Sequence, residues 1–187
     1  GGQGVVTAAE LLSVAAFDQG HHAQAFPSFG SERTGAPVVA FCRIDEHEIR
    51  LREPILAPDV LIVQDPTLLH QVDVFQGLHA EGYVLINSQR SFHDLGLADI
   101  EKRYRHDRLA TVPATEIALR HLGRPLPNAV LLGGFAALSG LISLDAVGHA
   151  IRAKFAGKVA QANVAAAAEA YAFVRQELED LAHAQAD

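Results

Sequence analysis

The sequence predicts an α/β domain, Rossmann-like, with three layers: a mainly parallel sheet and helices on both faces. Three short runs carry this prediction, 60–65 (VLIVQD), 83–88 (YVLINS) and the weaker 108–114 (RLATVPA). Continuous apolar runs are typical of strands buried on both faces of a parallel sheet. Helical segments are expected after the first and third runs, at 67–77 and 114–122, and alternation of strand and helix is typical of parallel α/β domains.

The chain opens with a glycine turn, Gly1-Gly2-Gln3-Gly4, followed by a helix expected at 5–19. Apolar residues recur there at helical spacing, and Gly20 suits the end of the helix. A glycine turn into a helix normally follows a β-strand. Either an initiator methionine was removed or, as we expect, a short N-terminal stretch lies outside the numbering and forms a strand of about 5 to 8 residues.

Shorter elements follow this helix. Strands are expected at 22–26 and 38–44, with a more exposed return strand within 48–56. The segment 27–37 (PSFGSERTGAP) between the first two is expected to be an ordered loop. Ordered loops of this length inside compact domains are uncommon and usually functional.

The last third of the chain is predicted to be helical. One helix is expected at 128–138, a second after an N-cap at Ser143, and a third from about Val159. Within the first of them, the pair Gly133-Gly134 predicts the close approach of another backbone. Because no linker or internal repeat interrupts the pattern, residues 1–187 are interpreted as one domain.

Composition excludes several functions. The net charge of −7 argues against nucleic acid as a partner. The sequence has no apolar stretch of about 18 residues, which argues against a membrane partner. The single Cys42, in the apolar run VVAFC, is interpreted as a buried hydrophobe and suits a reducing cytoplasm. One cysteine cannot hold an iron–sulfur cluster, and ten scattered histidines lack the spacing of a metal site.

The glycine turn is one candidate binding site, through Gly2, Gln3 and Gly4. Unpaired N–H groups at a helix start attract anions, so the turn is suited to a phosphate; a purely structural turn is the alternative. The turn lacks the Lys-Ser/Thr of a P-loop. A dinucleotide site would need a carboxylate about 20 residues on, and the expected second strand ends instead at Phe26-Pro27-Ser28.

The loop 27–37 is the other candidate, through Ser31, Glu32, Arg33 and Gly35. Arg33 offers a planar fork to a carboxylate or phosphate, and Glu32 could orient it or bind a cofactor. The alternative is a solvated charge pair. A third residue, Asp65, ends a buried strand where ligands often bind, but an N-cap for a helix beginning at Pro66 is the favoured interpretation.

At these residues a family resemblance emerges. GGQGVVTAAELL followed by AFPSFGSERTGAPVVAFCRI resembles the gamma subunit of the 2-oxoacid:acceptor oxidoreductases, the pyruvate:ferredoxin oxidoreductase family. The resemblance extends over nearly the whole chain, through VLIVQDPTLL, VLINS and the late GKVAQANVAAAAEAY. The last of these resembles a Lys-rich stretch of the family that leads into an Asn-headed helix. In that family the glycines follow a short first strand.

The resemblance implies a function that the residues alone do not show. The family oxidatively decarboxylates 2-oxo acids with CoA, yielding an acyl-CoA, CO₂ and two electrons. Thiamine diphosphate and iron–sulfur clusters lie mainly on other subunits, so this chain is expected to hold no cofactor alone and no catalytic residue. Its implied partners are the thiamine-binding and cluster-binding subunits, and an acceptor that is ferredoxin, or NAD through another subunit.

Two questions stay open at this stage. The small subunit of indolepyruvate oxidoreductase shares the glycine turn, but Ser31 to Pro37 match the pyruvate-type pattern except at Thr34, where a second arginine is common. Aryl-oxoacid enzymes of the phenylglyoxylate type carry similar gamma subunits, so the substrate is undetermined. A stand-alone α/β nucleotide- or CoA-binding module without redox partners is the alternative function.

Overall fold

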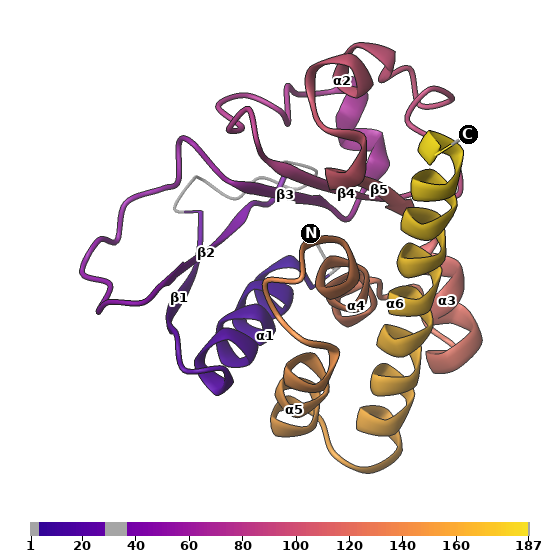
Figure 1. The fold of residues 1–187 in the computed structure, drawn as a ribbon. Helices are drawn as coiled ribbons and strands as arrows, with labels where there is room; N and C mark the ends of the chain where they lie inside the picture. The colour runs from indigo at the N-terminus through magenta and orange to yellow at the C-terminus, as the bar shows by residue number, and fades with distance from the viewer. Residues whose placement is uncertain (1–3, 29–36, 187) are drawn as a thin grey trace.

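Two β-sheets organise the chain in a computed structural model that describes residues 4–28 and 37–186 (Figure 1). The larger sheet is parallel, in the order β3 (Val60–Val63), β4 (Tyr83–Asn87), β5 (Leu109–Val112). The smaller is an antiparallel pair of β1 (His22–Pro27) and β2 (Ala40–Asp45). The predicted three parallel strands are confirmed, while the chain between α1 and β3 adds antiparallel strands.

Helices cover both faces of the parallel sheet. Figure 1 shows α4 and α6 on one face and α2 on the other, which confirms the three layers. The helices and 3₁₀ turns are α1 (Val5–Asp18), η1 (Pro66–His70), α2 (Ala98–Arg103), η2 (His106–Arg108), α3 (Ala114–Leu122), α4 (Asn128–Ser139), α5 (Leu144–Lys154) and α6 (Gly157–Ala186).

The central strand β4 divides the core in two. Leu85 packs into a cluster with the residues of α4 and α6, whereas Val84 and Ile86 pack into a second cluster with Ile100 of α2 and Tyr104. All three strand side chains are essentially inaccessible to solvent. Because successive side chains of a strand point to opposite faces, only a strand covered on both sides produces the uninterrupted apolar run seen in the sequence.

The helix α4 lies in the centre of the helical layer, packed against α6. All but the last of its twelve residues are buried. A Cβ added to Gly133 would lie 2.0 Å from the backbone oxygen of Ala167 in α6. The predicted close approach of a second backbone is therefore confirmed, and Gly133 is the residue that requires it.

The buried side chain of Asn87 links the ends of two strands to a helix. Its Nδ2 donates to the carbonyl of Gln64, 2.9 Å away, and to Oγ1 of Thr115, 2.8 Å away. Its Oδ1 accepts from the backbone N–H groups of Ala114 and Thr115, at 3.0 and 3.2 Å. Asn87 thereby satisfies two N–H groups in the first turn of α3, which has no side-chain cap of its own.

Replacing Asn87 by alanine should therefore destabilise the protein strongly. The change leaves buried donors and acceptors without partners, at about 1–3 kcal/mol for each, and we expect the free energy of unfolding to fall by about 3 kcal/mol. Urea denaturation measures it. Thr115→Val removes one of the four hydrogen bonds and should cost about 1 kcal/mol; equal losses for the two variants would contradict this role for Asn87.

Two predicted elements are wrong in type. The segment 67–77 is not an α-helix: only η1 forms, and turns follow it. Local side-chain bonds compete with the helix, since Asp65 accepts from the N–H of Thr67 at 3.0 Å and Asp73 from that of Phe75 at 3.1 Å. The return strand expected within 48–56 is absent from that stretch, which contains Pro54.

The boundaries of other elements differ by a few residues. Strand β2 begins at Ala40, two residues later than expected, and β1 includes Pro27. The short helix α2 was not expected, although its charges favour a helix: acidic residues occupy its first turn and Lys102 and Arg103 its last. The helix α6 begins at Gly157, so Asn163 lies inside it and does not head it as the resemblance implied.

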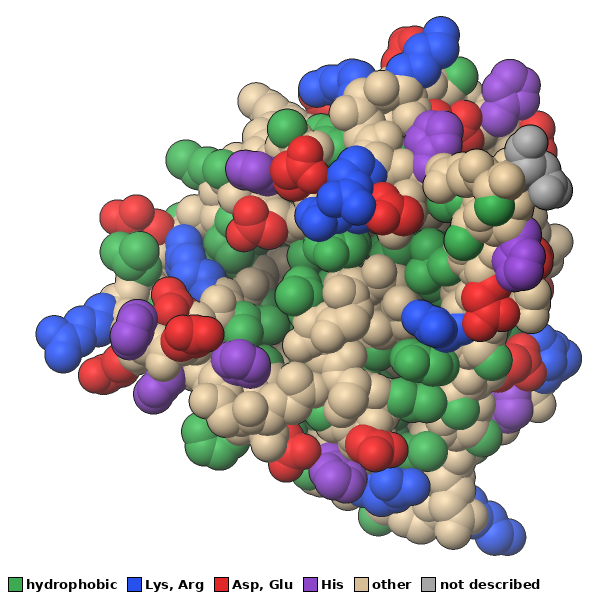
Figure 2. All heavy atoms as spheres, in the orientation of Figure 1, with side chains coloured by type: hydrophobic (Ala, Val, Ile, Leu, Met, Phe, Trp, Pro, Cys, Tyr) green, Lys and Arg blue, Asp and Glu red, His purple; other side chains and the backbone are tan. Residues whose placement is uncertain are grey.

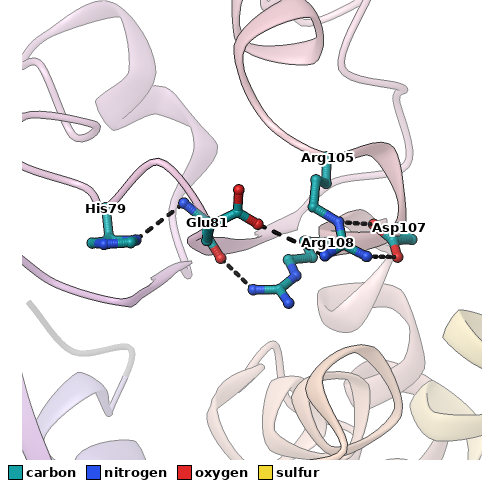
Figure 3. A network of polar contacts seen from close by, with 5 residues as sticks. All are labelled: His79, Glu81, Arg105, Asp107 and Arg108. Carbon is teal, nitrogen blue, oxygen red and sulfur yellow. Dashed lines mark hydrogen bonds and ion pairs between the residues drawn. The ribbon is translucent and has the colours of Figure 1, made fainter.

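Charged residues join the loops that precede β4 and β5 (Figure 3). Arg105 forms a bidentate pair with Asp107, at 3.0 and 2.7 Å, and holds the pKa of that carboxyl below its ordinary value. The third guanidinium nitrogen of Arg105, Nη1, lies 3.7 Å from a carboxylate oxygen of Glu81. The Glu81 carbonyl accepts from Arg108, and its N–H donates to Nδ1 of His79 at 3.1 Å. The network is exposed, so it orients loops more than it stabilises the fold.

A second ion pair joins α3 to α6. Arg120 donates to both carboxylate oxygens of Glu169, and Nε2 of His121 lies 3.1 Å from one of them. The hydrogen bond from Arg120 is the main cause that lowers the pKa of Glu169 from its ordinary 4.5. The charged carboxylate is thus favoured by folding. Its stabilisation is fully present above about pH 4.5 and is lost as the pH falls through the lower pKa of the folded state.

The lowered pKa of Glu169 predicts how the stability of a Glu169 variant depends on pH. Glu169→Gln should lower the melting temperature at pH 7 by a few degrees at most, because solvent screens this pair: the side chain of Glu169 is 34% exposed and that of Arg120 is 61% exposed. Below pH 4.5 the difference from the parent protein should shrink toward zero. Thermal unfolding from pH 7 to pH 3 tests this, with Glu177→Gln on the same helix as a control. A difference that grows on acidification would refute the assignment.

Candidate functional site

The structure describes one of the seven predicted site residues, Gly4. The other six, Gly2, Gln3, Ser31, Glu32, Arg33 and Gly35, lie outside the described residues. Their roles stay predictions. What the structure supplies is the surroundings into which the two segments lead.

Gly4 begins α1 in a conformation that suits only glycine. Its φ of 72° lies in the left-handed region, and a Cβ there would lie 2.4 Å from Nδ2 of Asn128. The carbonyl of Gly4 accepts from the N–H of Ala8 at 2.9 Å and from Asn128 Nδ2 at 3.4 Å. The turn is therefore held against the start of α4, and a glycine is needed there for structural reasons alone.

Both candidate segments lead to one cleft. Gly4, which follows Gly2 and Gln3, and Pro37, which follows Gly35 by two positions, are lining residues of the same cavity. Its volume is about 1350 Å³, and Figure 2 shows the surface hollowed between the β1–β2 pair and the helices, with apolar side chains beside the hollow. Gly4 and Pro37, the described residues nearest to the two candidate segments, thus line one cavity.

The walls of the cleft are mainly apolar, with polar side chains spaced around them. The walls are formed by the first turns of α1, by the chain from Pro37 to Cys42, which includes the start of β2, and by β3. The polar or charged lining side chains are Thr7, Gln64, Asp65, Thr67, Gln71, Asp73, Gln76, His121, Arg124, Asn128, Lys154, Lys158 and Asn163. The sequence analysis missed Asn128; an asparagine at the start of a helix was the available signal.

Several of these polar groups have structural roles. Asp65 caps η1, as the favoured interpretation held, and accepts from the hydroxyl of Thr67 at 2.7 Å. Lys154 lies 3.4 Å from a carboxylate oxygen of Glu10. The buried Asn163 donates to the carbonyl of Val159 within its own helix, at 2.9 Å. Asn163 therefore contributes to the wall while its amide nitrogen is bonded.

The thiol of Cys42 is not activated. The residue is half-buried in the wall of the cleft, and burial raises the pKa of its thiol to about 12. Since the thiolate is the reactive form, this agrees with its interpretation as a small hydrophobe. Within residues 4–28 and 37–186 no cluster of histidine, cysteine or carboxylate side chains is suited to a metal ion, and no helix is long and apolar enough to cross a bilayer.

Comparison with known proteins supplies the family. Residues 1–173 match the family model described as pyruvate ferredoxin/flavodoxin oxidoreductase. The chain belongs to this family. The gamma subunit common to the pyruvate and ketoisovalerate oxidoreductases of Pyrococcus furiosus is 47% identical over 171 residues, which are 91% of each protein. The resemblance to gamma subunits is thereby confirmed.

Two solved structures have a similar fold. A pyruvate oxidoreductase subunit PORC from Thermotoga maritima superposes with a TM-score of 0.74 at 34% identity, over 91% of this chain and 89% of that one. A 2-oxoglutarate:ferredoxin oxidoreductase from Magnetococcus marinus matches with a TM-score of 0.71 at 16% identity, over 94% of this chain but 30% of its own. The second likeness concerns the fold alone.

Proposed function

We propose that this protein is the gamma subunit of a complex that converts a 2-oxo acid and CoA into an acyl-CoA and CO₂, passing two electrons to an acceptor. The observation that carries the proposal is the 47% identity with a gamma subunit along nine-tenths of both chains. Loss of CO₂ leaves an acyl unit at the aldehyde level, and its oxidation to a thioester releases the two electrons.

The cofactors of this reaction belong to other subunits. Thiamine diphosphate supplies the carbanion chemistry and iron–sulfur clusters take the electrons. This chain has a single cysteine, Cys42, and a cluster needs about four thiolates. The partners are accordingly a thiamine-binding and a cluster-binding subunit of the same complex, in the cytoplasm.

The loop and the glycine turn form the part of this chain that faces the partners. Arg33 anchors an anionic group, either a phosphate of CoA or a carboxylate of the adjoining chain, with Ser31, Glu32 and Gly35 beside it. Gly2, Gln3 and Gly4 are the second candidate contact, through the N–H groups at the start of α1. The position of Gly4 and Pro37 on one cleft supports this arrangement.

Pyruvate is the substrate that the relatives favour. The names of the Pyrococcus and Thermotoga proteins include pyruvate, and the former also includes ketoisovalerate. A gamma subunit common to two oxidoreductases leaves the choice of substrate to other subunits, so an aryl 2-oxo acid such as phenylglyoxylate is a second candidate. The acceptor is ferredoxin, or NAD through another subunit.

Affinity purification from the native host tests the proposal. A tag on the C-terminal end of this chain should recover thiamine-binding and cluster-binding subunits, together with CoA-dependent reduction of an acceptor by pyruvate. Recovery of a stable free monomer that binds CoA or a nucleotide would favour the alternative, a stand-alone α/β binding module.

Arg33→Lys should impair the complex, although the substitution retains the positive charge. Lysine retains the charge but loses the bidentate fork, so we expect about a tenfold rise in KM for CoA or a comparable loss of assembled complex. Steady-state kinetics and subunit stoichiometry measure the two effects. Arg50→Lys, at an exposed position, is the matched control. An unchanged KM, turnover and stoichiometry would show that the loop is ordinary surface.

A further inference from the structure

One face of the antiparallel pair β1–β2 has no helix packed on it within residues 4–28 and 37–186. The pair lies at the edge of the molecule, beside α1 (Figure 1). The helix α1 packs on both strands, and no other helix in the described part of the chain makes comparable contact with them. Because one helix covers one face of a two-stranded sheet, the opposite face is left without a second layer.

The small residues of the pair face α1. Side chains of a strand alternate between the two faces, and the register places Ala25 opposite Cys42 and Ala23 opposite Ile44. Short side chains such as those of Ala23 and Ala25 allow a helix to lie close to the strands, as α1 does. The thiol of Cys42 is desolvated, and this burial raises its pKa to about 12. The covered face is therefore the one that carries Ala25 and Cys42.

The opposite face carries two aromatic rings, a valine and an arginine. Phe26 lies across from Phe41, with ring centroids 5.2 Å apart, and the guanidinium of Arg43 lies 5.4 Å from the centroid of the Phe26 ring. A hydrogen bond from the N–H of Ser28 to the carbonyl of Val39, at 2.8 Å, extends the pairing to Val39. Val39 shares the side of Phe41 by alternation and is 46% exposed. These four residues, Phe26, Val39, Phe41 and Arg43, are called the outer face below.

Two polar groups on this side lack partners within the described chain. Arg43 donates one long hydrogen bond, from Nη1 to the carbonyl of Leu51 at 3.5 Å, and forms no ion pair with a described carboxylate. Across the pair from Arg43, Oε1 of Gln24 is buried without a hydrogen-bond donor among these residues. A guanidinium presents five N–H groups in a planar fork that suits a carboxylate. The group that the outer face lacks is therefore an anion.

We propose that the outer face binds another subunit of the complex, through an apolar segment of that subunit that also carries a carboxylate. The apolar side chains cover Phe26, Val39 and Phe41, and the carboxylate pairs with Arg43. The inference rests on the proposed function, because an assembled complex is what supplies the missing layer. Aromatic residues and arginine are enriched where subunits meet, whereas lysine and glutamate are depleted there and occupy none of the four positions.

Two observations favour a different subunit over a second copy of this chain. A two-fold contact centred on so small a face brings Arg43 of each copy close to Arg43 of the other, and the two like charges repel. The loop 27–37 joins β1 to β2, and the proposed function already assigns this loop to the partners. Leu51, whose carbonyl accepts from Arg43, is 59% exposed and widens the apolar surface. One continuous interface can include the loop and the outer face.

Co-purification with matched variants tests the inference. The tagged chain is co-expressed with the other subunits of the complex, and the molar amount of each recovered subunit is measured. Val39→Asp and Arg43→Glu should each lower the recovery of a partner subunit by about tenfold or more. The controls are Leu119→Asp, at a position on α3 that is 47% exposed, and Arg175→Glu, at an exposed position on α6. Both controls should recover as much of each partner as the parent chain does.

A second measurement does not depend on the folding of a variant. Circular dichroism of each purified chain shows whether it folds. If a variant of the outer face does not, hydrogen exchange of the parent chain decides: exchange in the segments 22–27 and 39–45 should slow by about tenfold or more when the complex assembles. Equal exchange in the free chain and in the complex would overturn the inference.

The outcomes separate this inference from the proposed function. A parent chain that recovers no other subunit refutes both. A parent chain that recovers its partners, beside folded Val39→Asp and Arg43→Glu variants that recover them equally well, refutes the outer face and leaves the proposed function standing. A dimer of the free chain that Arg43→Glu abolishes would assign the face to a second copy, and would also overturn the inference.

Discussion

Produced without partner subunits, this chain is expected to reduce no electron acceptor with any 2-oxo acid, even when thiamine diphosphate and CoA are supplied. The physical reason is the lack of redox groups. A single cysteine cannot bind a cluster, and the second predicted strand ends without the carboxylate that a dinucleotide site needs. The electrons of the decarboxylated substrate would have no carrier.

The measurement is a reduction assay under anaerobic conditions. The purified chain is compared with the co-expressed complex at equal gamma-subunit concentration, with pyruvate as substrate and a dye as acceptor. We expect activity in the complex and none above background in the single chain. Turnover by the single chain would contradict both this expectation and the assignment of cofactors to other subunits.

The surface of the chain agrees with a subunit role. The sequence left open whether its many hydrophobic residues, 49% of the total, form a large core or a surface for other subunits. The structure has both features. The helix α4 is almost wholly buried, while Phe17 and Leu56 remain 72% and 84% exposed. Exposed apolar side chains of this size are frequent where subunits meet.

The sequence predicts the elements that a run of apolar residues specifies, and it fails where hydrogen bonds from neighbouring side chains decide the backbone conformation. Strands β3 and β4 are recognisable because burial between two layers favours a short continuous apolar run, Val60–Val63 in β3 and Val84 to Ile86 in β4. The segment 67–77 has apolar residues at spacings that a helix would also show, yet the capping carboxylate of Asp65 and a second one at Asp73 turn its backbone out of the helix. Such short-range side-chain bonds are invisible to a search for periodicity.

The candidate site is predictable only in part for a different reason. Glycine at position 4 and the close approach at Gly133 follow from local rules, and the structure bears them out. The roles of Asn87 and Asn128 depend on residues 23 and 124 positions away, so a single sequence does not reveal them. The available signals were an asparagine that ends a buried apolar run, at Asn87, and an asparagine at the start of a helix, at Asn128.

The contact between α4 and α6 predicts a large difference between two neighbouring glycine variants. A Cβ at Gly133 would lie 2.0 Å from the backbone oxygen of Ala167, and a backbone atom cannot move aside without displacing its helix. A Cβ at Gly134 would meet side chains at ordinary distances, the nearest being Cδ2 of Leu85 at 3.4 Å. The first substitution overpacks a rigid contact, and the second fills available space.

We therefore expect Gly133→Ala to lower the free energy of unfolding by about 3 kcal/mol, and Gly134→Ala to leave it unchanged or raise it by up to about 1 kcal/mol. Both changes gain the same helix propensity, so that contribution cancels in their difference. Urea denaturation followed by circular dichroism measures both variants. Failure of Gly133→Ala to fold, beside a folded Gly134→Ala, is the same result in stronger form. Stabilities within 0.5 kcal/mol of each other would show that α4 and α6 separate easily, and that the close packing of the two helices does not hold this domain together.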